Sequence, residues 1–495
     1  MADDGREISD LPAPPDARDR PRVGVDEWVA QVEDRRARYT GLAGLLRRRI
    51  AFVPAPARLA LFAAFAASLP LWMGRGDLFS YGIFTLLYAL LGLGLNVVVG
   101  YAGLLDLGYI AFFGFGAYFY AELSSEQYGI HWPAVASMPV VVVATALLGL
   151  VLGLSSRRLL GDYLAIVTLF FGQAFVVFVN VGNPTVAGKG LTGGPNGIAD
   201  IDPLDFFGYE LTSRTQQFYF LLLSVVVLLV GLHFLSESRT GRAWRALRED
   251  PLAAETMTIP VKRLKLMAFA FGAGIAGFAG CIFASVLTAV TAGNFDLPLL
   301  ITIYAVVILG GLGSLTGVVL GAIVINVSFQ FLAPENPQNN ARLLFYAVVL
   351  VLIVLALRPW WRAAAVVVAV IGVGLVTQLV VDAVAPSWSG GPVLEGGRLA
   401  GVIDDWVVIS EPGHGRFGSW AYVTLVVAIL ALTRIRGWLR TVAVVPVVYL
   451  AAVVWENSFV EQPAVARWIL FGALLVGLMT VRPQGLLGTP RVEIV

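Results

Sequence analysis

Two glycine-containing stretches have residue types that bind nucleotides in other proteins. Gly272, Gly274 and Gly277 form a G-x-G-x-x-G pattern, but they lie inside an apolar stretch and not between a strand and a helix, as a dinucleotide site requires. Residues 182–189, GNPTVAGK, have five residues between the glycines where a phosphate-binding loop has four, and Gly190 replaces the hydroxyl residue that would bind magnesium. The sequence therefore predicts no nucleotide site.

Metal binding and catalysis find equally little support. His131, His233 and His414 are far apart, and no pair has the spacing of metal ligands. Cys281 is the only cysteine, so neither a disulfide nor a cysteine-based metal site can form within the chain. We expect a protein without enzymatic activity, cofactor or metal.

Polar side chains are rare within the apolar stretches. The polar residues in or near them are Asn96, Thr168, Gln173, Thr302 and Tyr304. Such groups either hydrogen-bond between helices or line a path for a small zwitterion. Carboxylates are nearly absent there, with Asp106 and Asp162 near expected helix ends. This scarcity argues against transport driven by a bound proton or sodium ion, although backbone carbonyl groups can also bind sodium.

The segment 237–265 is charged and helix-prone, and it lies between two long apolar stretches. Arg245 and Glu249 have the spacing of a helical ion pair. Asp250 followed by Pro251 is typical of a helix start, which predicts a short helix over 252–259 ending at Pro260. The segment is either a surface loop with solvated charges or a contact for a soluble partner that moves the membrane part.

The positions of these polar residues and of the 237–265 segment are set by the membrane helices around them. Hydrophobic residues make up 58% of the chain and charged residues 14%, and apolar stretches long enough to cross a bilayer recur along it. We predict an all-α integral membrane protein, a polytopic bundle of about 11–14 transmembrane segments. The stretch 299–311 is short enough to be re-entrant.

Charge distribution predicts the orientation. Arginine and lysine cluster at 47–49, 157–158, 239–248, 262–265, 358–362 and 434–440. Acidic residues concentrate in the loops of opposite parity, at 200–210 and 395–411. Because positive loops stay in the cytoplasm, we place both termini and the 237–265 loop there.

Four regions follow from composition. Residues 1–55 form a partly disordered cytoplasmic tail, and residues 56–360 form the core membrane domain with its 237–265 loop. Residues 361–465 form an additional transmembrane extension with a periplasmic loop. Residues 466–495 form a terminal membrane helix and a cytoplasmic tail.

An ordered set of motifs resembles a known family, the permease subunits of branched-chain amino acid ABC importers, in their LivM-like form. The matching stretches are LNVVVGYAGLLDLGYIAFFGFGAYFYAEL (95–123), DYLAIVTLFFGQ (162–173), LTGGPNGI (191–198), GRAWRALREDPLAAETMTIP (241–260), VVILGGLGSLTGVVLGA (306–322) and RPQGLLG (482–488). The chain departs from the family's pattern at Thr258, where members often have glycine, at Gln173, where many have glutamate, and in the 361–465 extension.

The resemblance implies roles for two groups of residues. Residues that would contact the ATPases are Glu249, Asp250, Ala253, Ala254 and Ile259. Residues that would lie on the substrate pathway or contact the binding protein are Asn96, Thr168, Gln173, Thr192, Gly193, Gly194, Pro195, Asn196 and Gly197. For 192–197, a simple packing turn is the alternative interpretation.

The resemblance also implies the assembly. The chain would be a multi-pass permease subunit in a bacterial inner membrane, paired with a second, LivH-like permease, two cytoplasmic ABC ATPases and a periplasmic binding protein. Its cargo would be branched-chain or related amino acids, and its partners would hydrolyse the ATP. Alternatives are a permease for urea or short amides, a stand-alone secondary transporter or channel, and a structural scaffold.

Overall fold

The computed structural model describes most of the chain from residue 55 onward. The described residues are 55–126, 129–156, 162–182, 184–186, 189–331, 340–356, 360–384, 401, 406–409, 416–434, 438–461, 468–469, 471–472, 475–476 and 485–487. The predicted tail 1–55 lies almost wholly outside this part, as do most of the predicted terminal helix and tail 466–495. The chain divides into two units, residues 1–66 and 67–495.

Long apolar helices dominate the described residues and confirm the predicted fold class. Seven are long and apolar enough to cross a membrane: Arg75–Tyr101, Ala134–Leu154, Tyr163–Val181, Arg214–Glu237, Val261–Leu287, Ala292–Gly310 and Trp361–Val384. Four are shorter: Leu59–Leu71, Leu315–Phe331, Trp420–Leu432 and Thr441–Asn457. The seven candidate spans are fewer than the predicted 11–14 transmembrane segments, and only with the four shorter helices does the number among the described residues reach eleven.

The helical elements up to residue 331, with the loops between them, contain all of the family motifs except RPQGLLG (482–488). In chain order they are α3 (Ala55–Ser68), η2 (Leu69–Leu71), α4 (Arg75–Asp77), η3 (Leu78–Ile83), α5 (Phe84–Leu95), η4 (Asn96–Tyr101), α6 (Tyr109–Leu123), α7 (Ala134–Ser156), α8 (Asp162–Val181), η5 (Gly194–Asn196), α9 (Arg214–Glu237), α10 (Arg239–Glu249), α11 (Pro251–Thr256), α12 (Val261–Leu287), η6 (Ala292–Phe295), α13 (Leu297–Gly310) and α14 (Leu315–Phe331).

Helix α12 is central to this bundle because α5, α6 and α7 all pack against it. Glycine makes the closest approaches possible: a methyl group on Gly116 of α6 would overlap the backbone of Gly277 in α12. Elsewhere in the bundle, α14 packs against both α13 and α5.

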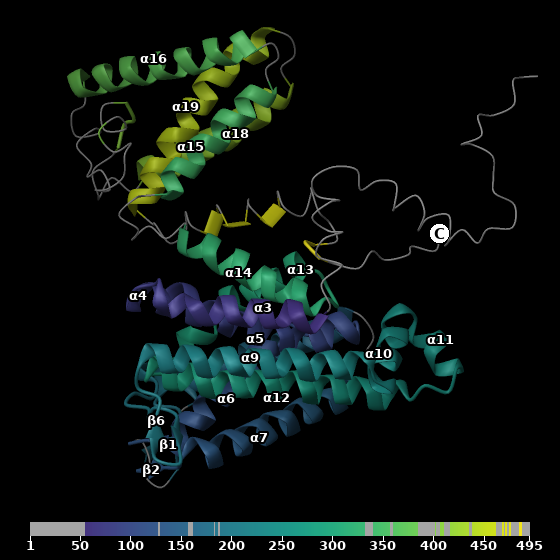
Figure 1. The fold of residues 1–495 in the computed structure, drawn as a ribbon. Helices are drawn as coiled ribbons and strands as arrows, with labels where there is room; N and C mark the ends of the chain where they lie inside the picture. Colours follow the sequence, from purple (N-terminus) through teal and green to yellow (C-terminus); the bar gives the residue numbers. More distant parts are fainter. Residues whose placement is uncertain are drawn as a thin grey trace, which may run out of the picture. The chain divides into compact units, whose positions relative to one another are not determined.

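The loops of this bundle gather at two ends, with α9 and α12 running between them (Figure 1). One end has three short antiparallel pairs: β1 (Ser124–Ser125) with β2 (Ile130–His131), β3 (Thr185–Val186) with β4 (Lys189–Gly190), and β5 (Asp205–Phe206) with β6 (Tyr209–Glu210). We call this the hairpin end. At the other end, α10 and α11 project beyond the membrane helices, and we call this the α10–α11 end.

Four further helices belong to or adjoin the extension: α15 (Asn340–Ala356), α16 (Trp360–Val384), α18 (Arg416–Arg434) and α19 (Trp438–Glu461). Helices α15, α16 and α19 share an apolar core that includes Ile353, Val366 and Val453. A buried ion pair joins α15 to α19, with Arg342 Nη2 2.9 Å from Glu456 Oε2. Tyr346 also donates to this carboxylate, over 3.0 Å to Oε1. The sequence did not predict this pair. Arg342 and Glu456 each lie near one end of an apolar stretch, where a charged residue is ordinarily taken to face water.

Candidate functional site

The helix start at Asp250 is confirmed. The Asp250 side chain accepts hydrogen bonds from the backbone N–H groups of Leu252 and Ala253 at 2.8 and 3.1 Å, and Pro251 occupies the first helical position. Helix α11 ends at Thr256, earlier than predicted. Ile259 N–H donates to Ala254 O and Thr258 N–H to Glu255 O, which together form a Schellman turn.

This turn explains the departure at Thr258. Its φ is +64°, in the left-handed region where glycine pays no steric penalty and a β-branched residue does. The position where related sequences often have glycine is therefore one where the backbone favours it. The backbone of Thr258 is strained, yet both hydrogen bonds of the turn are present.

Most residues expected to contact an ATPase lie on the outer surface of this loop. Glu249, Asp250 and Ala253 are exposed, and Ile259 is partly exposed. Ala254 is only 4% exposed and faces the chain's own interior, because α11 packs against α12. Sequence reasoning missed two large apolar side chains there, Leu252 and Met257, each 75% exposed.

Helix α10 is anchored to the membrane helices by its buried face. Trp244 is fully buried, and its Nε1 donates to Leu264 O of α12 over 2.9 Å. Leu247, one turn later, is buried as well. Arg245 does not pair with Glu249 as expected and instead donates to Ser236 O over 3.1 Å. The Trp244 side chain therefore fixes α10 directly to α12.

Arg248 extends from α10 into the bundle. Its Nη1 donates to the backbone carbonyl of Gly100 over 2.6 Å, at the end of the π-helical segment η4. Gly103 and Gly313 adjoin the same side chain, since a methyl group on either would lie 2.9 Å from Arg248. Arg248 therefore links α10 to two turns from distant parts of the sequence.

Asn96 supports the same junction. Its Oδ1 accepts from Gly313 N–H over 2.8 Å, which ties the start of η4 to the turn between α13 and α14. Leu486 N–H donates to Leu309 O over 2.7 Å, so the RPQGLLG segment contacts the end of α13. Asn96 is fully buried and joins elements of the bundle.

Thr168 is also a link between elements. Its Oγ1 accepts from Leu107 N–H over 2.9 Å and donates to Ala165 O, so it connects α8 to the segment 102–108 before α6. In that segment Asp106 is fully buried, and its Oδ1 accepts from Gly108 N–H. Asp106 Oδ2 has no hydrogen-bond partner among the described residues, and burial raises the pKa of this carboxyl group to about 7.

Gln173 has a different environment from Asn96 and Thr168. It is exposed on α8, on the face that also presents Phe170 and Val177 at 70% and 61% exposure. An amide facing hydrocarbon is costly, so this face is suited to contact with protein or water and not with lipid alone.

The predicted segment 192–197 lies at the hairpin end as a glycine-rich turn. Gly193, Gly194 and Gly197 have φ values of +68°, +61° and +70°. Thr192 is buried, and its Oγ1 donates to Val179 O of α8 over 2.9 Å. Pro195 and Asn196 are exposed, so they are the members of this group that a soluble partner could reach.

The hairpin end is held together by links between its loops. Ile198 and Val290 exchange two backbone hydrogen bonds of 2.9 and 2.8 Å. His131 Nδ1 lies 2.6 Å from Asp202 Oδ2, and this carboxylate raises the pKa of His131. The turn over 192–197, the 288–296 connection and β2 therefore form one connected surface.

Comparisons with known proteins agree with the motifs. The family model described as "Branched-chain amino acid transport system / permease component" matches residues 78–357. The high-affinity branched-chain amino acid transport system permease protein LivM of Salmonella typhimurium is 37% identical over 298 residues, covering 55% of this chain and 68% of the relative. LivM of Escherichia coli gives the same identity and coverage.

A probable LivH permease of Methanocaldococcus jannaschii is 28% identical over 199 residues, covering 39% of this chain and 61% of the relative. No solved structure matches this chain. The extent of the family match and the identity to two LivM proteins agree with the ordered motifs and with the helical bundle. The chain belongs to the family of branched-chain amino acid transport system permease components, and within it resembles LivM.

Proposed function

We propose that this chain is a membrane subunit of an ATP-driven importer for branched-chain or related amino acids. It would form the translocation pathway with a second, LivH-like permease. Two cytoplasmic ATPases would hydrolyse ATP, and a periplasmic binding protein would deliver the substrate. The observation that carries the proposal is the exposed α10–α11 loop, whose buried face is fixed to the membrane helices through Trp244 and Arg248.

The loop's geometry suits transmission of force. Glu249, Asp250 and Leu252 are exposed where a soluble partner can contact them, while the opposite face of α10 packs on the bundle. A partner that displaces α10 would move Leu264 of α12 and Gly100 of η4 together. Such coupling is reciprocal, so substrate at the far side should raise ATP hydrolysis.

The charges of the two ends support an orientation in which the α10–α11 end lies in the cytoplasm. Arg239, Arg242 and Arg245 belong to the α10–α11 end, whereas Asp202, Asp205 and Glu210 belong to the hairpin end. By the positive-inside rule, the α10–α11 end and both termini would face the cytoplasm. The hairpin end, with Pro195 and Asn196, would then receive the binding protein.

The test is leucine-stimulated ATP hydrolysis by the complete complex, reconstituted with its binding protein. Glu249→Ala should abolish stimulation while the complex still assembles. Asp250→Asn, which keeps a side-chain oxygen for the cap, separates the role of the charge from the cap that Asp250→Ala also removes. Asp382→Ala, which removes an exposed carboxylate of α16 outside both ends, is the matched control and should leave leucine stimulation unchanged.

Each outcome distinguishes one alternative. Stimulation by urea but not by leucine would leave the mechanism standing and change the cargo. Uptake that persists without the ATPases and collapses with the ion gradient would make the chain a secondary transporter. Failure of any ATPase to associate would overturn the proposal.

A further inference from the structure

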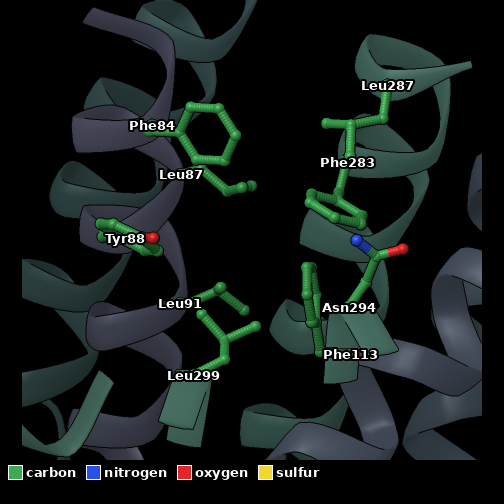
Figure 2. A pocket seen from close by; sticks show the side chains of 9 residues that line it. All are labelled: Phe84, Leu87, Tyr88, Leu91, Phe113, Phe283, Leu287, Asn294 and Leu299. Atoms are coloured by element: carbon green, nitrogen blue, oxygen red, sulfur yellow. The ribbon is translucent and has the colours of Figure 1, made fainter. Parts of the chain in front are cut away.

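A small cavity opens between α5 and α12, next to η6 and α13. Its volume is about 180 Å³. Figure 2 shows Phe84, Leu87 and Leu91 of α5 on one side and Phe283 and Leu287 of α12 on the other. An apolar cavity of about 150 Å³ is large enough to bind benzene. This cavity therefore has room for the branched aliphatic side chain of an amino acid.

One amide is oriented toward this apolar space. Asn294 Oδ1 accepts from both the backbone N–H and the hydroxyl of Thr291, each over 2.9 Å. These bonds fix the carboxamide, and its nitrogen faces the gap between the two helices (Figure 2). An Asn amide nitrogen is a donor only. The cavity thus presents an apolar wall and a positioned donor, which match the aliphatic side chain and the carboxylate of an amino acid. The ammonium group of the amino acid has no partner among the described residues of this lining and has to stay hydrated at the open side of the cavity.

We propose that this cavity is a transient site for the transported amino acid, with the aliphatic side chain between α5 and α12 and the carboxylate bonded to Asn294 Nδ2. The inference rests on the proposed transport function and adds a defined site within the membrane domain. Among the described residues, no charged side chain lines the cavity. Its ligand is therefore held weakly, as a site that must release its occupant requires.

The cavity is connected to the hairpin end. Val290, which is hydrogen-bonded to Ile198, lies four residues before Asn294 in the same connection. Gly197 packs so closely on this connection that a methyl group there would overlap Val290 O. A binding protein that displaces the 192–197 turn would therefore move Asn294 as well. Delivery of the substrate and the geometry of its site are linked through this backbone contact.

A larger groove elsewhere does not fit the same ligand. It lies between α7, α9 and α12, has a volume of about 870 Å³ and is lined almost wholly by apolar side chains such as Met138 and Phe271. Ser224 is the polar residue of its lining, and its hydroxyl donates to Phe220 O of its own helix. The described residues of this lining supply no oriented donor for a carboxylate.

Protection of an introduced thiol tests the proposal in the complete complex. Leu299→Cys lines the cavity, and Leu297→Cys on the same helix is 43% exposed and lies outside it. The native Cys281 is fully buried, so it gives little background. Leucine at about ten times its half-protecting concentration should slow modification of Leu299→Cys by a small thiol reagent about tenfold. Aspartate should not protect it, and modification of Leu297→Cys should not respond to leucine.

A second variant tests the donor. Asn294→Asp keeps the oxygen that caps η6 and replaces the amide nitrogen by an acceptor. In combination with Leu299→Cys it should abolish protection by leucine and reduce leucine uptake. Leucinol, which lacks the carboxylate, should protect the Leu299→Cys protein poorly even when Asn294 is intact.

The outcomes separate this inference from the proposed function. If the wild-type complex imports leucine but leucine and aspartate protect Leu299→Cys equally, or neither protects it, the cavity is not the site. Unchanged uptake by Asn294→Asp would equally overturn the role of the donor. If the wild-type complex imports no leucine at all, the proposed function fails first.

Discussion

Arg248 and Gly100 are 148 residues apart in the chain, yet Arg248 Nη1 lies 2.6 Å from Gly100 O. The bond joins α10, outside the membrane helices, to the end of η4 within the bundle. A π-helical segment such as η4 has i→i+5 backbone hydrogen bonds in place of the i→i+4 bonds of an α-helix, and such segments are frequently found at functional sites. This contact is therefore well placed to change when α10 moves.

Arg248→Met should uncouple ATP hydrolysis from transport. The variant keeps the apolar stem but removes a charge-assisted bond worth about 1.5–3 kcal/mol. Leucine imported per ATP hydrolysed should fall, while association with the ATPases persists. Arg242→Met is the control, because the exposed Arg242 side chain bonds, among the described residues, to Glu237 O beside its own helix. Equal coupling in the two variants would contradict a transmitting role for Arg248.

Gly313→Ala should destabilise the protein more than Gly208→Ala. Both glycines have positive φ, +83° and +87°, so both substitutions carry a backbone cost of roughly 1–2 kcal/mol. Only at Gly313 would the new methyl group also meet Arg248, whereas Gly208 has open space around it. Thermal unfolding in detergent measures the difference. Equal thermal midpoints for the two variants would show that the Arg248 side chain moves aside with no loss of stability.

Thr258→Gly should raise the thermal midpoint of the protein. Relief of the left-handed conformation at a non-glycine residue is worth about 1 kcal/mol. Thr288→Gly is a second test, since Thr288 has φ of +59° at the end of α12. Ala253→Gly, inside helix α11, should instead lower the midpoint, because glycine weakens a helix interior. A lower thermal midpoint for Thr258→Gly would show that the positive φ of Thr258 does not strain the folded protein.

The pKa of His131 should lie above 6.5. Asp202 favours the protonated ring, so the stability that this pair contributes is fully present below the unfolded-state pKa and is lost as pH rises through the folded-state pKa. The chain has three histidines, which makes an NMR titration of labelled imidazoles assignable. Asp202→Asn should return the pKa of His131 towards its ordinary value. An unshifted pKa in the wild-type protein would rule out the ion pair in solution.

Asp106→Asn should stabilise the protein above pH 7 and have less effect at pH 5. Burial raises the pKa of Asp106 from 3.8 to about 7, so the folded protein loses stability as pH rises from about 4 to 7 and the loss is complete above 7. The asparagine keeps the acceptor for Gly108 N–H and carries no charge. Thermal midpoints measured from pH 5 to 8 test this. Parallel curves for the two proteins would mean that Asp106 is already solvated.

Features set by neighbouring residues could be predicted from the sequence. The cap at Asp250 and the apolar helices depend on local residue order, and both were predicted. Arg248 with Gly100 and Arg342 with Glu456 could not be, because each pair joins segments more than a hundred residues apart. The inward position of Ala254 depends on how α11 packs against α12, and composition does not determine that packing. The cavity beside Asn294 is likewise formed by several elements at once.

The roles of Asn96 and Thr168 also could not be decided from the sequence. Their polar types in apolar stretches allowed either a pathway or a link between helices, and the sequence left both open. The structure gives each a backbone partner across an element boundary. Gln173 has the same kind of side chain, but the periodicity of α8 places it on an exposed face. A residue type alone could not separate these cases.

The contact between Leu486 and the end of α13 has a consequence for biogenesis. Leu309 and Gly310 present two of the last carbonyl groups of α13, and Leu486 and Leu487 satisfy them. The helices of the extension are synthesised between these two segments. The core bundle therefore cannot complete this helix end until the ribosome has made the whole extension. A nascent chain that ended before residue 485 would contain every helix of the core. It would still lack the backbone N–H groups of Leu486 and Leu487 that bond to the end of α13.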